Sequence, residues 1–214
     1  MRTSRKACGC DRLFGGSRPA LKQDGQLGPA VRELALQRLA RGGVWRPGNG
    51  LETGVAQGPL IEKKAVEKVE EHIADALAKG AKVLTGGQRH EKGGQFFQPT
   101  VLTGVTTAMK ITHEETFGPV APLYRFKAED ELLKLANDTE YGLAAYFYSR
   151  DIGRVWRVAE GLEAGIIGIN VGIISTEVAP FGGMKESGIG REGSKYGMEE
   201  FLEVKYLCMG GIDK

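Results

Sequence analysis

Apolar side chains recur along residues 62–79 with the spacing of one face of an α-helix. Positions three and four apart lie together on a helix, so this spacing predicts an amphipathic helix over the whole stretch. Lys79 stands in its last turn, and Gly80 follows as a residue suited to a left-handed cap. The predicted buried face consists of Val66, Val69, Ile73 and Leu77.

The rest of the later chain shows shorter helical patterns and short runs rich in apolar and aromatic residues. Gly86 and Gly87 mark the end of the first such run. Because strands that alternate with helices favour an α/β fold, we predict a parallel sheet flanked by helices. The predicted helices cover residues 129–137 and 151–163, and the predicted strands cover residues 82–85, 120–126, 143–149 and 166–170.

Composition narrows the class of protein. The 214 residues are 41% hydrophobic and carry a net charge of +2, which gives no reason to expect nucleic acid or a membrane as partner. No run of 18 apolar residues is present to span a bilayer. Three cysteines are too few for a disulfide scaffold, so a reducing compartment is expected. The 32 glycines imply many tight turns.

The charge divides the chain into two unlike pieces. Residues 1–46 hold ten Lys or Arg against three acidic residues, a balance of +7, and the remainder has 19 basic and 24 acidic residues, a balance of −5. We predict a divergent, poorly ordered segment over residues 1–46, with one short helix at 30–40, and a folded domain over 47–214. The basic N-terminal segment resembles a mitochondrial transit peptide, whereas Asp11 and several turn residues argue against that assignment.

One glycine-rich stretch has the letters of a dinucleotide-binding turn. Gly188, Gly190 and Gly193 have the G-x-G-x-x-G spacing. A true fingerprint follows a buried strand, opens a helix and has an acidic residue about 20 positions on. The residues before Gly188 are too polar for a buried strand, and too few follow Gly193 for a βαβ unit. We therefore predict that this stretch does not bind a pyrophosphate.

The sequence gives little support for a metal site or for the common hydrolase and NTPase motifs. His72, His90 and His113 lie apart, without partners at metal-ligand spacing, so we predict no metal site and expect each histidine at the surface or at a helix cap. Neither a G-x-S-x-G elbow nor a phosphate-binding P-loop occurs, which disfavours hydrolases and NTPases. The tract HEETFGP at 113–119 is unusual, and from the residues alone it is either a polar loop or a functional one.

Four motifs in the same order resemble the C-terminal half of the NAD(P)-dependent aldehyde dehydrogenase superfamily. They are EETFGPV at 114–120, GLAAYFYS at 142–149, GIIGIN at 165–170 and the run from Pro180 to Tyr206. Residues 49–70 and the GIISTEVAPFGG run resemble the succinate-semialdehyde dehydrogenase branch in particular. The resemblance implies an α/β aldehyde-dehydrogenase-like catalytic domain, truncated so that the N-terminal Rossmann-like cofactor domain is missing, with a C-terminal oligomerisation strand.

The resemblance also implies roles for single residues. Glu115 would accept hydrogen bonds from the nicotinamide ribose, and Phe117 would pack at the nicotinamide. Phe181 would line the aldehyde pocket, and Ser175 would bind the distal carboxylate of succinate semialdehyde. Gly188, Gly190 and Gly193 would serve tight turns beside the active site. From its place after a predicted buried strand, and not from the resemblance, Asn170 is expected to be a strand-end amide and not a site residue.

The nucleophile of the family is a cysteine, and the N-terminal segment keeps part of its pattern. Cys8 would attack the aldehyde, Arg2 would bind the substrate carboxylate, and Cys10 would be a neighbour able to form a reversible disulfide with Cys8. Arg5 and Lys6 replace the Gly and Gln of the family pattern. The alternative is that Cys8 and Cys10 are reduced thiols in a disordered tail.

Two functions follow from the resemblance. The first is NAD-dependent oxidation of succinate semialdehyde to succinate, with NADP as an alternative cofactor and an aldehyde as the small-molecule substrate. We expect the chain to be inactive alone, because the upstream glutamate base and the cofactor domain of the family are absent. The second is a non-catalytic form that joins homo-oligomers or full-length subunits through residues 201–207. A mitochondrial location is expected, with the cytoplasm as the alternative.

Overall fold

The computed structural model describes residues 46–212. The chain divides into two compact units, of which the first ends at Glu131 and the second begins at Leu132. The helix predicted over residues 30–40 lies outside the described residues. None of the helices within residues 46–212 has the length and apolar character that crossing a membrane requires.

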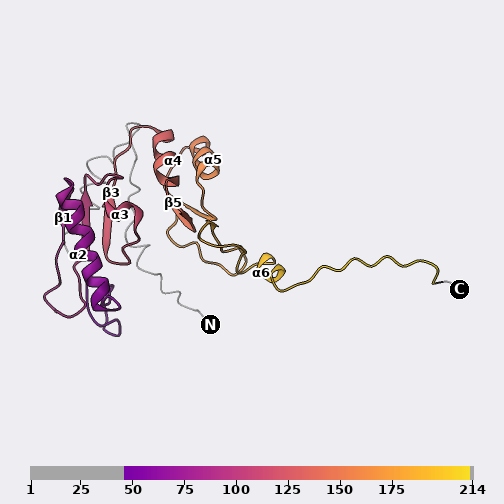
Figure 1. The fold of residues 1–214 in the computed structure, drawn as a ribbon, viewed down its shortest axis with the longest axis horizontal. Helices are drawn as coiled ribbons and strands as arrows, with labels where there is room; N and C mark the ends of the chain where they lie inside the picture. The colour runs from indigo at the N-terminus through magenta and orange to yellow at the C-terminus, as the bar shows by residue number, and fades with distance from the viewer. Residues whose placement is uncertain (1–45, 213–214) are drawn as a thin grey trace, which may run out of the picture. The chain divides into compact units, whose positions relative to one another are not determined.

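The first unit combines a small mixed sheet with one long helix, α2 (Lys63–Ala78). The sheet consists of β1 (Lys82–Thr85), β2 (Thr100–Thr103) and β3 (Val120–Leu123) in that order. β2 is the central strand, antiparallel to β1 and parallel to β3. Figure 1 shows α2 running alongside these strands. The short helix α3 (Lys110–His113) lies between β2 and β3 in the chain.

The core of this unit forms where α2 meets the sheet. Its largest fully buried side chains include Phe97, Leu102 and Met109. The predicted helix is confirmed, and Gly80 follows it with φ of +98°. The predicted buried face is confirmed in part. Val66, Val69 and Ile73 are buried, but Leu77 is 44% exposed, and His72 and Ala76 are buried in addition.

Charged side chains fasten α3 to α2. The backbone N–H of Lys110 donates to Asp75 Oδ2 at 2.8 Å, and its ammonium pairs with Glu71. Lys79 contacts Asp75 at 2.7 Å and donates to the carbonyl of Ala108 at 2.8 Å. The hydrogen bond from Lys79 lowers the pKa of Asp75, and that from Lys110 lowers the pKa of Glu71. These contacts fix the start of the chain segment that follows α3.

The second unit contains two separate strand pairs. The pair β4–β7 is antiparallel and the pair β5–β6 is parallel. Figure 1 shows α4 and α5 in this part of the chain. The side-chain amide of Asn137, at the end of α4, donates to the carbonyl of Gly161 at 2.7 Å and ties the ends of these helices together. The elements are α4 (Glu129–Asn137), β4 (Tyr141–Gly142), β5 (Ala144–Phe147), α5 (Ile152–Gly161), β6 (Ile166–Ile169), β7 (Met184–Lys185) and α6 (Tyr196–Glu199).

Most predicted elements form, with shorter ends. α4 and β1 have the predicted bounds, while α5, β3, β5 and β6 are each shorter than predicted. The predicted parallel pairing is confirmed for β2–β3 and β5–β6, whereas β1 is antiparallel to its neighbour. Two apolar residues of α5, Ile152 and Trp156, are 71% and 63% exposed.

The predicted C-terminal strand does not form within the described chain. Residues 201–211 are neither helical nor paired as a strand. Their apolar side chains face solvent, with Phe201, Val204 and Tyr206 exposed by 87%, 98% and 85%. The predicted pairing of residues 201–207 with another subunit stays a prediction.

Candidate active site

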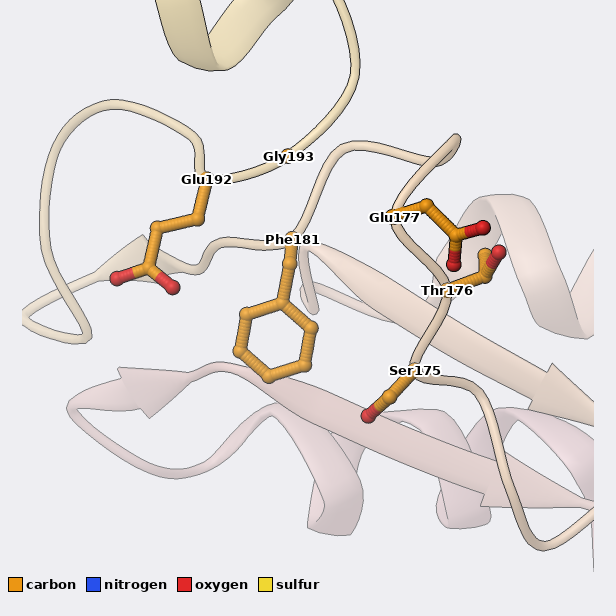
Figure 2. A pocket seen from close by; sticks show the side chains of 6 residues that line it. All are labelled: Ser175, Thr176, Glu177, Phe181, Glu192 and Gly193. Carbon is orange, nitrogen blue, oxygen red and sulfur yellow. The ribbon is translucent and has the colours of Figure 1, made fainter.

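An open hollow of about 490 Å³ lies in the second unit. Ser175 and Phe181, both predicted to contact the substrate, line it together. Figure 2 shows the Phe181 ring between Glu192 on one side and Ser175 on the other. The full lining is Ser175, Thr176, Glu177, Phe181, Glu192 and Gly193.

A two-residue bridge holds Phe181 in place. Its N–H donates to the carbonyl of Glu192 at 2.8 Å, and the N–H of Glu192 donates back at 2.7 Å. The bridge closes the loop 182–191 on itself. Inside that loop the Arg191 guanidinium donates to the carbonyl of Gly183 at 3.0 Å. The loop is therefore a compact unit that fixes where the Phe181 ring points.

The G-x-G-x-x-G stretch begins in this loop, and its last glycine, Gly193, directly follows the bridge. Gly188, Gly190 and Gly193 have φ of +117°, +89° and +66°, values that favour glycine. No helix starts at Gly190, and α6 is only four residues long. The prediction that these glycines serve tight turns, and do not open a dinucleotide-binding helix, is confirmed.

The opposite wall of the hollow is held by the chain after this loop. The N–H of Ser194 donates to the carbonyl of Glu177 at 2.9 Å. A Cβ at Gly193 would lie 3.1 Å from the carbonyl oxygen of Ala179, so the two backbones approach closely there. The segment that carries Ser175 is therefore positioned by contacts from residues 193 and 194.

The chemical character of the hollow is mixed. Phe181 offers an apolar ring, Ser175 and Thr176 offer hydroxyls, and Glu177 and Glu192 offer carboxylates. The six lining residues include no Lys or Arg. A ligand that ends in a carboxylate would need a cation from elsewhere to offset the two acidic side chains.

Sequence reasoning did not single out Thr176, Glu177, Glu192 or Gly193 as lining residues. Thr176 and Glu177 adjoin Ser175, so their presence follows from the predicted site. Glu192 lines the hollow because its backbone pairs with that of Phe181, eleven residues earlier. No periodic pattern of side chains marks such an isolated bridge.

The predicted cofactor contacts lie in the first unit, on the segment after α3. Glu115 and Phe117 are both exposed, Phe117 by 78%. Phe117 has φ of +46°, in the left-handed region that a bulky residue seldom adopts. A carboxylate and an aromatic ring are thus presented side by side on a backbone held in an uncommon conformation.

The expectation that His72 lies at the surface or at a helix cap is wrong. Its side chain is fully buried in the middle of α2. One ring nitrogen lies 2.9 Å from Thr116 Oγ1 and the other lies 3.2 Å from Glu114 Oε2. His113 is exposed, as predicted, and His90 is half-buried. Within residues 46–212 no three potential ligands gather as a metal site would require.

The remaining predicted residues have different outcomes. Asn170 is confirmed as a strand-end amide, since its side chain bonds the N–H and the carbonyl of Ser149 at 3.0 and 2.8 Å. Arg2, Cys8 and Cys10 lie outside the described residues. Cys208 is an exposed free thiol.

Comparison with known proteins gives consistent matches. The model of the aldehyde dehydrogenase family matches residues 30–207. The 3-sulfolactaldehyde dehydrogenase of Pseudomonas putida is 65% identical over 169 residues, which cover 79% of this chain and 35% of the relative. The NADP(+) succinate-semialdehyde dehydrogenase GabD of Escherichia coli K12 is 66% identical over 163 residues, which cover 76% and 34%.

A solved structure extends the match to the fold. The crystal structure of succinate-semialdehyde dehydrogenase from Burkholderia pseudomallei superposes with a TM-score of 0.80 at 60% identity, over 84% of this chain and 37% of that chain. The predicted aldehyde-dehydrogenase-like α/β fold is thereby confirmed. The chain spans about a third of the length of the curated relatives it matches. The chain belongs to the aldehyde dehydrogenase family.

Proposed function

We propose that this chain supplies the catalytic-domain portion of an NAD(P)-dependent dehydrogenase that oxidises succinate semialdehyde to succinate. The observation that carries the proposal is the hollow that Ser175 and Phe181 line together. Relatives that act on succinate semialdehyde and on 3-sulfolactaldehyde support an aldehyde with an acidic group as substrate.

The hollow suits an aldehyde chain of this kind. The Phe181 ring would pack against the methylene groups, and the Ser175 hydroxyl would donate to the distal carboxylate. Because Glu177 and Glu192 line the same space, the carboxylate also needs a cation. The resemblance assigns that part to Arg2.

The first unit supplies groups that fit a nicotinamide ribose. Glu115 is an exposed carboxylate able to accept from ribose hydroxyls, and the exposed ring of Phe117 could cover one face of the nicotinamide. When bound, the nicotinamide supplies the acceptor for the hydride that the oxidation releases. NAD and NADP share the nicotinamide ribose, so these contacts serve both.

The covalent step would fall to Cys8. Its thiolate sulfur would add to the carbonyl carbon, forming a C–S bond while the carbonyl electron pair moves to oxygen. Loss of the hydride leaves a thioester, and a water then replaces sulfur to release the acid and the free thiol. The aldehyde and one water thus give the carboxylic acid, one hydride and one proton.

A rate measurement tests the catalytic proposal. In keeping with the expectation that the chain is inactive alone, the purified chain should give no reduced nicotinamide from NAD or NADP with succinate semialdehyde, and any turnover that it does show should be lost in Cys8→Ala. Cys208→Ala is the matched control, because this exposed cysteine should not affect the rate. Ser175→Ala should raise KM by about ten-fold through the lost bond to a charged group, with a smaller effect on kcat. Turnover that survives Cys8→Ala would contradict the proposal.

A second candidate function is assembly without catalysis. Its specific support is the row of exposed apolar side chains at Phe201, Val204 and Tyr206 in a segment that pairs with no described strand. Such a segment can add a strand to the sheet edge of another subunit. Absence of turnover together with binding to full-length subunits of the family would favour this function.

Sedimentation velocity tests the assembly candidate. The unaltered chain should sediment as a dimer or larger species, and Val204→Pro should shift it toward the monomer, because proline cannot donate to a strand ladder. Val204→Thr is the control, since it keeps the β-branched shape and the backbone donor. A monomeric unaltered chain that also fails to bind full-length subunits would exclude this role for the segment. The predicted mitochondrial location rests on the resemblance alone and stays a prediction.

A further inference from the structure

A buried histidine connects α2 to the segment that carries the candidate cofactor contacts. We propose that His72 is a positioning residue that fixes the backbone of Glu114–Phe117 in the conformation from which Glu115 and Phe117 can contact a nicotinamide ribose. The proposal rests on the function proposed above for Glu115 and Phe117. His72 itself is fully buried, so it acts through its neighbours and not by touching a ligand.

The hydrogen bonds of His72 define its tautomer. Its Nε2 lies 3.2 Å from a carboxylate oxygen of Glu114, and a carboxylate accepts hydrogen bonds, so Nε2 carries the proton. In the neutral ring Nδ1 is then an acceptor, and the Thr116 hydroxyl donates to it across 2.9 Å. One imidazole thus holds the residues on both sides of Glu115.

The same segment touches α2 at a second point. A Cβ added at Gly118 would lie 2.3 Å from Val69 Cγ2, so the backbone after Phe117 lies directly on the helix. Val69 and His72 are one helical turn apart and are both fully buried. The segment is therefore fastened before and after Phe117 by two side chains of one helix face.

The conformation of Phe117 explains why such fastening is needed. Its φ of +46° is unfavourable for a residue with a Cβ, and such conformations persist only where the surroundings determine them. The exposed Phe117 ring, at 78%, contributes little packing of its own. On the N-terminal side of Phe117, His72 bonds the side chains of Glu114 and Thr116, and the N–H of Glu114 donates to the carbonyl of Lys110 at 2.9 Å.

The tautomer can be tested directly in the unaltered protein. Nitrogen-15 NMR of the 214-residue chain should show the His72 ring protonated at Nε2 and unprotonated at Nδ1, with a slowly exchanging Thr116 hydroxyl proton. A ring protonated at Nδ1 alone, or averaging between tautomers as for an exposed histidine, would overturn the proposal.

Variants test the consequence for the segment. His72→Leu keeps the buried apolar volume but removes both bonds. Exchange of the Glu114 amide, whose N–H donates to the carbonyl of Lys110 at 2.9 Å, should therefore accelerate by about ten-fold. His72→Gln restores one donor and one acceptor and should return exchange to within about three-fold of the unaltered rate. His90→Leu is the matched control, since the His90 ring accepts a hydrogen bond from the N–H of Lys92, two residues on, and not from the segment 114–117. Unchanged exchange in His72→Leu would contradict the proposal.

Thr116→Val tests the same contact without a substitution in α2. It removes the hydroxyl that donates to Nδ1 while keeping the branched shape, and it should accelerate exchange of the Glu114 amide in the same way. Exchange at the β2–β3 amides should stay at the unaltered rate in all of these variants. If Thr116→Val leaves exchange of the Glu114 amide unchanged, His72 does not position the segment.

Nicotinamide mononucleotide separates this inference from the proposed function. Its ribose should shift the Glu115 and Phe117 resonances of the unaltered chain, and His72→Leu should weaken its binding by about ten-fold, with His72→Gln restoring it. If the unaltered chain fails to bind while His72→Leu still accelerates exchange, the ribose contact fails and the positioning role stands. Binding with equal affinity in His72→Leu overturns the positioning role.

Discussion

Replacing Phe97 with alanine is expected to lower the free energy of unfolding of the first unit by about 3–5 kcal/mol. Phe97 is fully buried and packs in the core formed by α2 and the sheet, with Leu102 and Met109 in the same cluster. Removing the ring loses the free energy gained by burying it. It also leaves a cavity that the neighbouring side chains on the helix and the sheet can fill only in part. Urea denaturation followed by circular dichroism measures the loss.

The matched control for this substitution is Phe201→Ala. Phe201 is the same residue type but is 87% exposed, so its truncation should change stability by less than about 0.5 kcal/mol. Equal losses for the two variants would show that the buried cluster around Phe97 is not the main source of stability in the first unit.

The second large effect is expected from Gly165→Ala, which addresses the wall of the candidate active site. A Cβ at Gly165 would lie 1.9 Å from the carbonyl oxygen of Gly182, a contact that only a backbone shift can relieve. We expect a loss of about 1–3 kcal/mol and displacement of the loop that starts at Phe181. The amides of Phe181 and Glu192, which bond each other, should then exchange faster.

Gly210→Ala is the control for Gly165→Ala, because a Cβ there would meet nothing within 4 Å. It should leave both the unfolding transition and the Phe181 amide unchanged. If Gly165→Ala also leaves the Phe181 amide protected, the close approach of residues 165 and 182 does not shape the hollow.

The helices were the most predictable part of the fold. α2 and α4 both follow the apolar spacing of a helix, although α4 has no buried residue, and Gly80 marks the end of α2 with the left-handed φ that its position suggested. The short strands were harder. β2, which is central and almost fully buried, is only four residues long and mixes Thr with apolar residues, so no alternation marks it.

The site was predictable where the family motifs are local. Ser175 and Phe181 lie six positions apart in one motif and share the hollow, as the resemblance implied. Glu192 joins them through a backbone bridge that side-chain patterns do not encode. The burial of His72 could have been predicted from the sequence. It stands between Val69 and Ile73 on the buried face of α2, where a surface histidine would not be expected.

The positive φ of Phe117 had no sequence signal. Bulky residues avoid this region, and the conformation depends on contacts from α2, more than forty residues earlier in the chain. Long-range contacts of this kind decide how the candidate cofactor residues are presented.

Chemical-shift mapping of the labelled 214-residue chain tests the central claim most directly. The account predicts that nicotinamide mononucleotide shifts the amides of Glu115 and Phe117, and that succinate semialdehyde shifts those of Ser175 and Phe181. Shifts confined to other residues, or no saturable shift with either compound, would contradict the claim that this chain carries the cofactor and aldehyde contacts of an aldehyde dehydrogenase.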